Sequence, residues 1–429
     1  MKALISAGGF GTRLVGLTGG EIPKPMVEIC GKPILLYAIE TLKNNGVDEF
    51  FISVSHLPEK IIGYFGDGFK FGVKINYIKE ESPLGSGGAL YYLKGKVNDD
   101  FIVCSGDVIF DIDVKKMLAF HKRKKAAATL FTHPNSHPYD SDIIVCDRNK
   151  RVKSIDLKTN KRDYAYFNNV NAGFFVFSPE TLGLLSAPVK MNLERDFITR
   201  LIRSGERVYA YKSPEFIKDV GTPERFHAVE KQIESGLVFR RNLKNPQKAI
   251  FLDRDGTINV YKGFIRSAEN IELVESAGDA IKAINESGYL AIVVSNQPVI
   301  ARGEATFKDV DDTFRKIETL LGSYGAFIDG FYYCPHHPKK GFKGEVKRLK
   351  KDCDCRKPKI GLLKKAEKDF NLDLSACYII GDSEVDVLTG VNAGIPQIKV
   401  KSGLYEEEKT RPTFYADDLK SAVDIILRG

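Results

Sequence analysis

The sequence predicts an α/β protein of two domains, each a doubly wound sheet with helices on both faces. Three observations predict this class. The chain has 429 residues, which exceeds the size at which a single hydrophobic core keeps growing. Short β-branched and aromatic runs alternate with amphipathic helical stretches. The alternation stops at the polar, proline-containing stretch "RRNLKNPQK", residues 240–248, and then restarts.

The expected elements follow the chain in order. The first half contains strongly apolar strand candidates at residues 2–6, 50–55, 101–105 and 173–178. A charged helical stretch near residues 224–235 precedes the polar break, and further strands are expected at 248–252, 290–295 and 378–380. We therefore expect domains at residues 1–235 and 248–429, joined by a linker at 236–247.

The composition is that of a soluble globular protein, with 43% hydrophobic and 28% charged residues. Its apolar runs are far shorter than a membrane span, and no secretory signal is visible, so we expect a cytoplasmic protein without a membrane partner. Seven scattered cysteines without a disulfide framework agree with a reducing compartment. The net charge of +8 is spread along the chain, which favours small anionic substrates over nucleic acid. The oligomeric state is left open.

A glycine-rich loop, "AGGFGTRL" at residues 7–14, follows the first expected strand. Gly8, Gly9 and Gly11 let the backbone pass close to an anion, and Arg13 adds a cation. A tight turn between a strand and a helix also needs glycine, so the loop alone leaves both interpretations open. The next segment, "PKPMVEICGKP", holds Lys24 between two prolines and favours a phosphate site.

The N-terminal half resembles the sugar-phosphate nucleotidyltransferases, whose signature is GGxGTRL followed by PKPM or PKPL. The resemblance continues in the family's order through "EESPLGSGGAL", "SGD", "NAG", "LERD" and "DVGTPERF", and covers residues 1–235. It implies a Rossmann-like domain in which a sugar 1-phosphate attacks the α-phosphorus of a nucleoside triphosphate and pyrophosphate leaves. Such chemistry needs alignment and charge neutralisation.

The resemblance also implies roles for individual residues of this half. Arg13 and Lys24 would neutralise phosphates, and Asp107 and Asp219 would hold Mg²⁺. The remaining matches are nucleotide contacts at Gly8, Gly9, Gly11, Thr12, Glu80 and Gly85, and sugar contacts at Asn171 and Glu194. A lone aspartate at a strand end is as often a helix cap, but here two such residues lie inside matching motifs. The chain departs from the family at "DLKTNK", so Lys158 receives no role.

In the C-terminal half, "IFLDRDGT" at residues 250–257 ends an apolar strand with two carboxylates. Alternation along a strand points Asp253 and Asp255 to the same side, where both can face one phosphate. Cation binding or helix capping would explain such a pair as well. However, "SNQ", "CRKP" and "GDSEVD" follow in the order of the haloacid dehalogenase-like phosphatases, which this half resembles.

That resemblance implies a covalent phosphatase mechanism. Asp253 would be the nucleophile and Asp255 the general acid and base. The resemblance assigns Mg²⁺ to Asp253, Asp382 and the backbone carbonyl of Asp255, and substrate contacts to Ser295, Asn296 and Lys357. Asp386 would support these residues from outside the metal's ligand set.

Four soft ligands form two tight pairs, "CPH" with Cys334 and His336 and "CDC" with Cys353 and Cys355. The set suits a closed tetrahedral zinc site, which leaves no open position for water. Its expected role is structural, because the second pair leads directly into Lys357. A zinc ribbon that binds nucleic acid through the Lys-rich stretch between the pairs is the alternative, with lower weight.

The zinc loop narrows the resemblance to histidinol-phosphate phosphatases and D-glycero-D-manno-heptose 1,7-bisphosphate 7-phosphatases. "IARG", "YYCPHHP" and "CDCRKP" look more like the heptose enzymes, which makes Arg302 and Arg356 candidates for holding a second phosphate. The chain reads "NQPVIARG" where that family commonly has NQSGIARG. Pro298 and Val299 therefore indicate an altered fit beside the substrate.

The two resemblances together predict a bifunctional enzyme. Its phosphatase half would release a heptose 1-phosphate, which its nucleotidyltransferase half would join to a nucleotide, GMP from GTP being the first choice. One alternative keeps both activities but uses another sugar or polyol phosphate with CTP, UTP or dTTP. A second alternative makes one half a non-catalytic sensing module.

Overall fold

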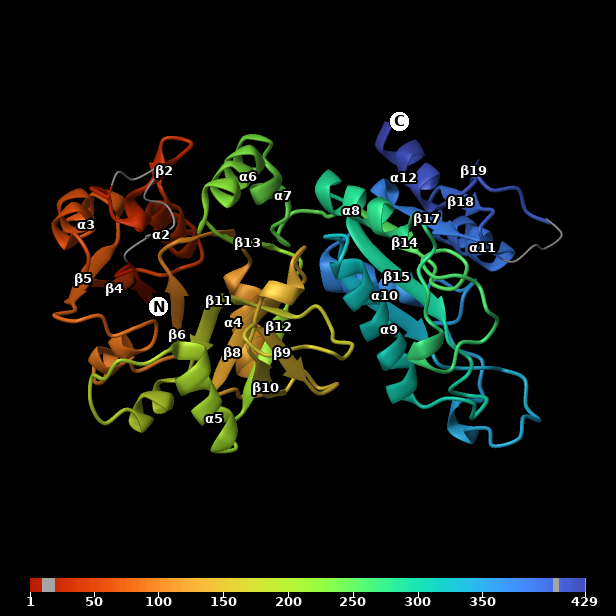
Figure 1. Cartoon of the computed structure of the whole chain (residues 1–429), viewed down its shortest axis with the longest axis horizontal. Coiled ribbons are helices and arrows are strands. Elements are labelled where there is room, and N and C mark those ends of the chain that lie inside the picture. Colours follow the sequence, from red (N-terminus) through yellow and green to blue (C-terminus); the bar gives the residue numbers. More distant parts are fainter. Residues whose placement is uncertain (10–19, 404–408, 429) are drawn as a thin grey trace. The chain divides into compact units, whose positions relative to one another are not determined.

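The computed structural model describes residues 1–9, 20–403 and 409–428, and it divides the chain into two compact α/β units (Figure 1). The predicted fold class is confirmed. Unit 1 comprises Met1–His133, Asp142–Leu157 and Val170–Asn242, and unit 2 comprises Pro134–Ser141, Lys158–Asn169 and Leu243–Gly429. The residue limits that we gave to the two domains and the linker stay a prediction.

Unit 1 is built on a nine-stranded sheet with the order β10-β9-β11-β6-β1-β4-β5. The other two strands branch from β11, since β8 pairs with β11 and β12 pairs with β8. The strands are β1 (Lys2–Ser6), β4 (Glu49–Val54), β5 (Lys74–Lys79), β6 (Phe101–Ser105), β8 (Ala128–His133), β9 (Ile143–Cys146), β10 (Val152–Asp156), β11 (Val170–Phe177) and β12 (Val208–Lys212). β1 is parallel to both β4 and β6, whereas β11 is antiparallel to β6 and β8. The sheet is therefore mixed rather than purely parallel.

The central strands of unit 1 are continuous apolar runs because both of their faces are covered. Side chains of one face, such as Ile5 and Ile52, pack in one buried cluster, and those of the other, such as Leu4 and Val103, in a second. The helices are α2 (Ile34–Asn44), α3 (Pro58–Phe65), α4 (Val114–Lys124), α5 (Thr199–Arg203), α6 (Pro223–Glu234) and α7 (Leu237–Arg240). The loops at the carboxyl ends of β1 and β6 carry the predicted site, as is usual in such sheets.

Two small two-stranded antiparallel sheets complete unit 1. β2 (Glu28–Ile29) pairs with β3 (Lys32–Pro33), and β7 (Val108–Asp111) pairs antiparallel with β13 (Phe216–Asp219). The second pair matters for the site, because its register places Asp219 opposite Val108. Residues more than one hundred positions apart are thereby joined at the end of β6.

Unit 2 is built on a parallel six-stranded sheet with the order β16-β15-β14-β17-β18-β19. The strands are β14 (Ala249–Leu252), β15 (Leu290–Asn296), β16 (Gly330–Cys334), β17 (Tyr378–Gly381), β18 (Gln397–Val400) and β19 (Phe414–Ala416). The helices are α8 (Ala277–Ser287), α9 (Phe307–Gly322), α10 (Gly361–Phe370), α11 (Glu384–Ala393) and α12 (Leu419–Arg428). β14 lies at the centre with every residue buried, so the segment that follows it enters a dry part of the unit.

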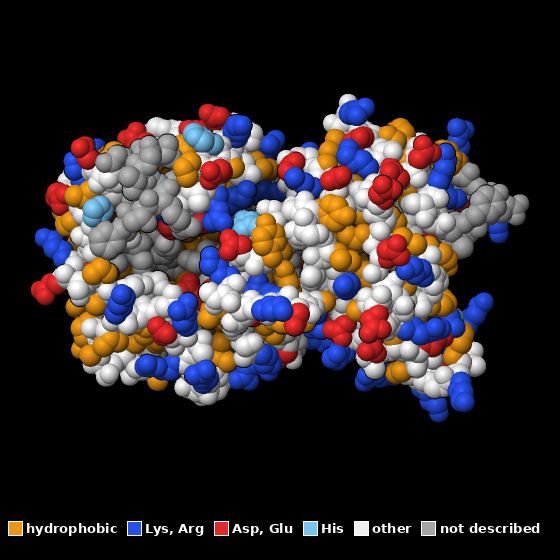
Figure 2. Space-filling model, in the orientation of Figure 1, with side chains coloured by type: hydrophobic (Ala, Val, Ile, Leu, Met, Phe, Trp, Pro, Cys, Tyr) orange, Lys and Arg blue, Asp and Glu red, His pale blue; other side chains and the backbone are white. Residues whose placement is uncertain are grey.

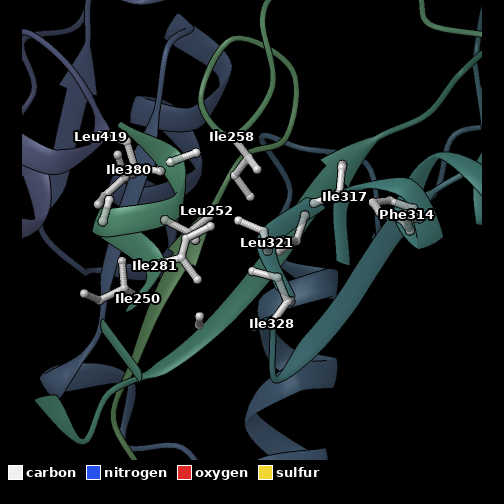
Figure 3. Packing of buried hydrophobic residues seen from close by; sticks show 14 of the residues in the cluster. Ile250, Leu252, Ile258, Ile281, Phe314, Ile317, Leu321, Ile328, Ile380 and Leu419 are labelled. Carbon is white, nitrogen blue, oxygen red and sulfur yellow. The ribbon is translucent and has the colours of Figure 1, made fainter. Parts of the chain in front are cut away.

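The main core of unit 2 lies between the sheet and the helices α8, α9 and α12 (Figure 3). Leu252 of β14 packs in one cluster with Ile281 of α8, Phe314 of α9 and Leu419 of α12. The N-terminus of α9 is fixed by a capping box between Thr306 and Asp309, which satisfies backbone groups that the helix itself cannot bond. This packing holds the strand that delivers the predicted nucleophile.

Two loops that precede and follow β9 and β10 in the chain belong to unit 2 by their contacts. In this unit Asn168 donates its backbone N–H to the buried Glu318 carboxylate of α9 at 2.8 Å, and Tyr166 donates to the Thr319 hydroxyl at 3.0 Å. The Asn168 side chain also bonds both backbone polar groups of Asn135, at 3.0 and 2.7 Å. No sequence pattern indicated that these loops would pack on α9.

Helix length, helix hydropathy and surface charge are the features that bear on membrane spanning. Among the helices formed by the described residues, none has the length and apolar character needed to cross a bilayer. On the face shown in Figure 2, Lys and Arg side chains of unit 2 are interspersed with Asp and Glu rather than gathered alone.

Candidate active sites

The first site begins at the carboxyl end of β1. Gly8 and Gly9 follow this strand, whereas Gly11, Thr12 and Arg13 lie outside the described residues. A Cβ atom at Gly8 would lie 3.2 Å from the Cβ of Ser55 and 3.7 Å from a carboxylate oxygen of Glu80. The glycine therefore lets the loop approach Glu80 closely, so that two predicted nucleotide contacts are neighbours.

Lys24 and Asp107 meet in the same site. The short helix η2 (Lys24–Met26) buries Lys24, whose ammonium forms an ion pair with Asp107. Asp107 also accepts a hydrogen bond from the Ser105 hydroxyl. Burial alone would raise the pKa of Asp107, but the Lys24 ammonium and the Ser105 hydroxyl outweigh burial and hold this pKa below its ordinary value. The site therefore contains an ionised carboxylate next to a fixed cation.

Asp219 is brought to Asp107 by strand pairing. The Val220 N–H donates to the Asp107 carbonyl at 3.0 Å, directly beyond the β7–β13 ladder. Both Asp219 carboxylate oxygens accept from the Arg225 guanidinium at 2.7 Å. The Asp219 carboxylate is thus paired with Arg225, and the Asp107 carboxylate is paired with Lys24. A divalent cation held by both carboxylates stays a prediction. Sequence reasoning quoted the motif that contains Arg225 but missed its role.

The predicted sugar contacts lie together on β11 and on η7 (Leu193–Ile198). The Asn171 side-chain amide donates to Glu194 at 3.2 Å. Burial raises the pKa of Glu194, and its hydrogen bonds from the backbone, Asn171 and Ser86 oppose that rise. The buried Asn171 Oδ1 has no hydrogen-bond partner among the described residues, so this oxygen has acceptor capacity that the protein does not use.

Gly85, a predicted nucleotide contact, lies in the loop that follows β5 and Glu80. Its φ is +71°, and a Cβ atom here would lie 2.6 Å from the Met191 carbonyl oxygen. The adjoining chain, including Glu80, is held by a 2.9 Å bond from the Leu84 N–H to the Glu80 carboxylate. Only glycine fits this turn without displacing backbone.

The second site is centred on Lys357 in unit 2. This lysine is 4% exposed, and its ammonium donates to Asp253, after β14, at 2.7 Å and to Asp386, in α11, at 2.5 Å. Asp382, after β17, completes a cluster in which ligand oxygens of the three aspartates lie within 4.8 Å of one another. Burial raises the pKa of Asp253, the Lys357 ammonium opposes this, and Asp386 and Asp382 raise it further.

The charge balance of this cluster fits a divalent cation. Three carboxylates face one ammonium in a buried place, so negative charge is in excess. Glycines leave the space that Asp382 occupies, because a Cβ atom at Gly256 or Gly403 would come within 2.2 or 1.8 Å of its carboxylate oxygen. Asp382 is therefore packed tightly toward the cluster.

Asp255 is held differently from Asp253. Its carboxylate accepts from the fully buried Arg254 guanidinium at 2.6 and 2.7 Å, and from Asn259 and Gln297 at 3.1 Å. These donors fix Asp255 beside the site, and sequence reasoning gave no role to Arg254 or Gln297. The signal was present in the motif, since an arginine between two site aspartates is a ready partner.

Ser295 and Asn296 close the same site at the end of β15. The buried Ser295 hydroxyl accepts from the Gln297 side chain at 2.8 Å. The Asn296 side chain bonds both backbone polar groups of Lys357, at 3.1 and 3.0 Å. Both residues lie at the carboxyl edge of the sheet, and the substrate contacts predicted for them stay a prediction.

Arg302 and Arg356, the candidates for binding a second phosphate, are held in place by neighbouring residues. The Arg302 guanidinium lies between the rings of Phe264 and Phe342, 4.5 Å from each ring centre, and forms a 2.5 Å ion pair with Glu304. Arg356 donates to the His336 carbonyl at 3.2 Å. Neither arginine is a freely moving surface cation.

Cys334, His336, Cys353 and Cys355 converge on one point. Their sulfur atoms are separated by 3.4 to 3.6 Å, and the His336 Nδ1 lies 3.3 Å from the Cys355 sulfur and 3.7 Å from the Cys334 sulfur. Zn–S bonds of about 2.3 Å in a tetrahedron require separations of about 3.8 Å, so the four ligands fit this ion. The donor set could hold a metal in the way that the sequence predicts.

Comparison with known proteins decides the classification. The profile of the family described as nucleotidyl transferase matches residues 2–236, which is more than half of the chain. The chain belongs to the nucleotidyl transferase family. A second profile, described as HAD-hydrolase-like, matches residues 354–422. The predicted combination of a nucleotidyltransferase with a haloacid dehalogenase-type phosphatase is confirmed.

Relatives with named activities match different shares of the chain. A D-glycero-beta-D-manno-heptose-1,7-bisphosphate 7-phosphatase of Haemophilus ducreyi is 38% identical over 159 residues, 37% of this chain and 85% of that protein. A UTP–glucose-1-phosphate uridylyltransferase of Synechocystis is 32% identical over 293 residues, 65% of this chain and 72% of that protein. A mannose-1-phosphate guanylyltransferase of Mycobacterium tuberculosis is 31% identical over 228 residues, 53% of this chain and 62% of that protein.

The protein is therefore a bifunctional enzyme, with nucleotidyltransferase and phosphatase activities in one chain. These relationships support catalysis by both halves rather than a non-catalytic sensing module in one of them.

Replacing Asp253 by asparagine is expected to lower phosphatase turnover at least about a thousandfold, because an amide cannot attack phosphorus. Nucleotide transfer to a sugar 1-phosphate is expected to stay at the wild-type rate, since that site lies in unit 1. Phosphate release and pyrophosphate release measured on the same preparation check both statements. Asp279→Asn, an exposed change on α8, is the matched control, and wild-type phosphatase turnover in Asp253→Asn would refute the role of Asp253.

Proposed function

We propose that unit 2 removes the 7-phosphate from D-glycero-D-manno-heptose 1,7-bisphosphate and that unit 1 then joins the heptose 1-phosphate to a nucleotide, with release of pyrophosphate. One observation carries this proposal: a region similar to a heptose bisphosphate phosphatase and a nucleotidyltransferase domain occupy the same chain. A 7-phosphatase leaves the anomeric phosphate in place, and this phosphate is the nucleophile that a sugar-1-phosphate nucleotidyltransferase requires. The two activities are therefore consecutive.

In the phosphatase reaction, an Asp253 oxygen attacks the 7-phosphorus, the bond to the sugar oxygen breaks, and an aspartyl phosphate forms. Asp255 protonates the leaving alkoxide and then takes a proton from the water that releases phosphate. Acting as an acid requires Asp255 to leave its paired position beside Arg254. The Lys357 ammonium and the Ser295 hydroxyl hold the transferring phosphoryl oxygens.

Mg²⁺ fits this site and would be held by Asp253, Asp382 and the backbone carbonyl of Asp255. When bound, the ion neutralises phosphoryl charge and favours the ionised form of Asp253. This second effect matters because burial and the neighbouring carboxylates raise the pKa of Asp253. The protein's own contribution is to align Asp253 with the phosphorus and to keep Lys357 charged between two carboxylates.

Arg302 and Arg356 are proposed to hold the 1-phosphate of the bisphosphate. Stacking between Phe264 and Phe342 restricts the Arg302 guanidinium to one plane, which prepares it for bidentate contact with a phosphate. A monophosphate would leave this binding energy unused. The proposal therefore includes a preference for the bisphosphate.

In unit 1, Lys24 and Arg13 are proposed to neutralise the triphosphate, and Gly8, Gly9, Gly11, Thr12, Glu80 and Gly85 to approach the nucleotide. Asp107 and Asp219 would hold Mg²⁺, which when bound shields the α-phosphate from the incoming negative charge. Asn171 and Glu194 would bind hydroxyl groups of the sugar, and the open acceptor on Asn171 supports this role. Catalysis here consists of alignment and charge neutralisation.

GTP is the proposed nucleotide. The guanylyltransferase relative acts on mannose 1-phosphate by its name, and the proposed heptose shares the manno configuration. The uridylyltransferase relative supports the alternative of another nucleotide and another sugar phosphate, and Pro298 and Val299 beside the phosphatase site agree with that alternative.

A single assay tests the proposed function. The protein, Mg²⁺ and D-glycero-D-manno-heptose 1,7-bisphosphate are incubated with GTP, CTP, UTP or dTTP in turn, and phosphate, pyrophosphate and nucleotide sugar are followed by mass spectrometry. GTP is expected to give GDP-heptose with stoichiometric phosphate. Phosphate without a nucleotide sugar would contradict the pairing of the two reactions, and absence of phosphate would contradict the sugar assignment.

The zinc site is proposed to be structural, holding the loop that ends in Arg356 and Lys357. Cys353→Ser is expected to lose bound zinc and to lower phosphatase kcat/KM by about tenfold or more, while nucleotide transfer stays unchanged. Cys377→Ser removes another cysteine of the same unit and is expected to retain zinc. Metal analysis and both activity assays check this prediction, and full phosphatase activity without zinc would refute it.

A further inference from the structure

The backbone of Lys357 is held by a neighbouring side chain, in addition to the ion pairs of its ammonium. The Asn296 side chain donates to the Lys357 carbonyl at 3.1 Å and accepts from the Lys357 N–H at 3.0 Å. Both polar atoms of this amide are therefore engaged with one residue of the loop. On the far side, Asn392 donates to the Pro358 carbonyl at 3.0 Å. The amide pair of Asn296 thus sets where the lysine leaves the loop.

Asn296 also lies next to the strand that carries Cys334, the first of the predicted zinc ligands. It is the last residue of β15, and it lies opposite Cys334 in the parallel pairing of β15 with β16. The next residue, Gln297, donates its N–H to the Cys334 carbonyl at 2.8 Å. Asn296 and Gln297 therefore contact the backbone at both ends of the metal loop, Gln297 through its N–H at Cys334 and Asn296 through its side chain at Lys357.

We propose that Asn296 is a positioning residue of the phosphatase reaction, which transmits the fixed position of the zinc-bound loop to the Lys357 ammonium. The sequence predicts a substrate contact for Asn296, whereas its amide in the structure serves the Lys357 backbone. The inference rests on the phosphatase activity of unit 2 and not on the identity of the sugar.

The consequence for catalysis follows from the surroundings of the lysine. Its ammonium must satisfy Asp253 and Asp386 at once, at 2.7 and 2.5 Å, and also meet the transferring phosphoryl group. Removing the amide of Asn296 frees two backbone groups of the loop and lets the start of the side chain shift. When the ammonium is displaced, the transition state loses more stabilisation than the bound substrate does. The mutation is therefore expected to affect kcat more than KM.

Asn296→Ala tests this inference, and the chain offers a close control. Asn285 of α8 makes the same reciprocal pair with the backbone of Phe327, at 2.9 and 2.9 Å, and neither Asn285 nor Phe327 is a predicted site residue. Asn285→Ala therefore removes the same chemistry from the same unit. The probes are p-nitrophenyl phosphate as a general phosphomonoester and orthovanadate as a mimic of the transferring phosphoryl group, both with Mg²⁺ present.

Asn296→Ala is expected to lower kcat by about 10- to 100-fold, the range found for residues that orient a site group, with KM changed less than about threefold. Orthovanadate affinity is expected to fall by a similar factor, and bound zinc to stay at the wild-type level. Asn285→Ala is expected to lower the unfolding temperature but to keep kcat and orthovanadate affinity. Asn296→Asp keeps the acceptor for the Lys357 N–H and loses the donor, and is expected to lose activity as well.

Three outcomes would overturn the inference. Wild-type kcat and orthovanadate affinity in both Asn296 variants would show that the lysine keeps its place without the amide. A raised KM with unchanged kcat would make Asn296 a direct substrate contact. Equal losses in Asn296→Ala and Asn285→Ala would reduce the effect to stability. Failure of wild-type enzyme on the heptose bisphosphate alone would overturn the proposed sugar and leave these comparisons on p-nitrophenyl phosphate intact.

Discussion

The phosphatase unit is organised around one buried ammonium group, that of Lys357. A charged lysine that is 4% exposed is stable only when its partners are close and fixed, because removing it from water is costly. Asp253 and Asp386 supply these partners from the ends of β14 and the start of α11, and Asp382 lies beside them. Three separate segments must therefore arrive together at the carboxyl edge of the sheet. The same arrangement leaves an excess of negative charge, which suits a divalent cation and, through it, a phosphate ester.

Unit 1 also contains a buried lysine that is paired with a carboxylate. Lys24 is buried against Asp107, and the antiparallel β7–β13 pair brings Asp219 to the adjoining backbone position. In both units a carboxylate just beyond the end of a parallel strand is paired with a buried lysine, Asp107 with Lys24 and Asp253 with Lys357. In unit 2 the lysine is carried by a loop rather than by a regular element, and the Asn296 side chain bonds the backbone of this loop at Lys357. In unit 1 the lysine follows Pro23 and precedes Pro25, and both prolines restrict the backbone.

Much of this organisation could be predicted from the sequence, because the relevant signals are local. Apolar strands followed by "SGD", "LDRDGT" and "GDSEVD" specify where the carboxylates lie, and the spacing of the cysteines specifies a metal site. What escaped prediction depends on tertiary contacts. The ion pairs of Arg225 with Asp219 and of Arg254 with Asp255 form because the folded backbone brings these side chains together. The antiparallel course of β11, and the packing on α9 of the loops that include Asn135 and Asn168, leave no pattern in composition or periodicity. Gly11, Thr12 and Arg13 remain predictions, since they lie outside the described residues.

The most direct test of consecutive catalysis by two separate sites is complementation between two inactive variants. Asp253→Asn and Asp107→Asn are each incubated with D-glycero-D-manno-heptose 1,7-bisphosphate, GTP and Mg²⁺, alone and as an equimolar mixture, and nucleotide sugar is measured over time. The account predicts that Asp253→Asn alone releases neither phosphate nor pyrophosphate, that Asp107→Asn alone accumulates heptose 1-phosphate, and that the mixture makes GDP-heptose. Nucleotide sugar formed by either variant alone, or none formed by the mixture, would contradict the assignment of the two steps to these two sites.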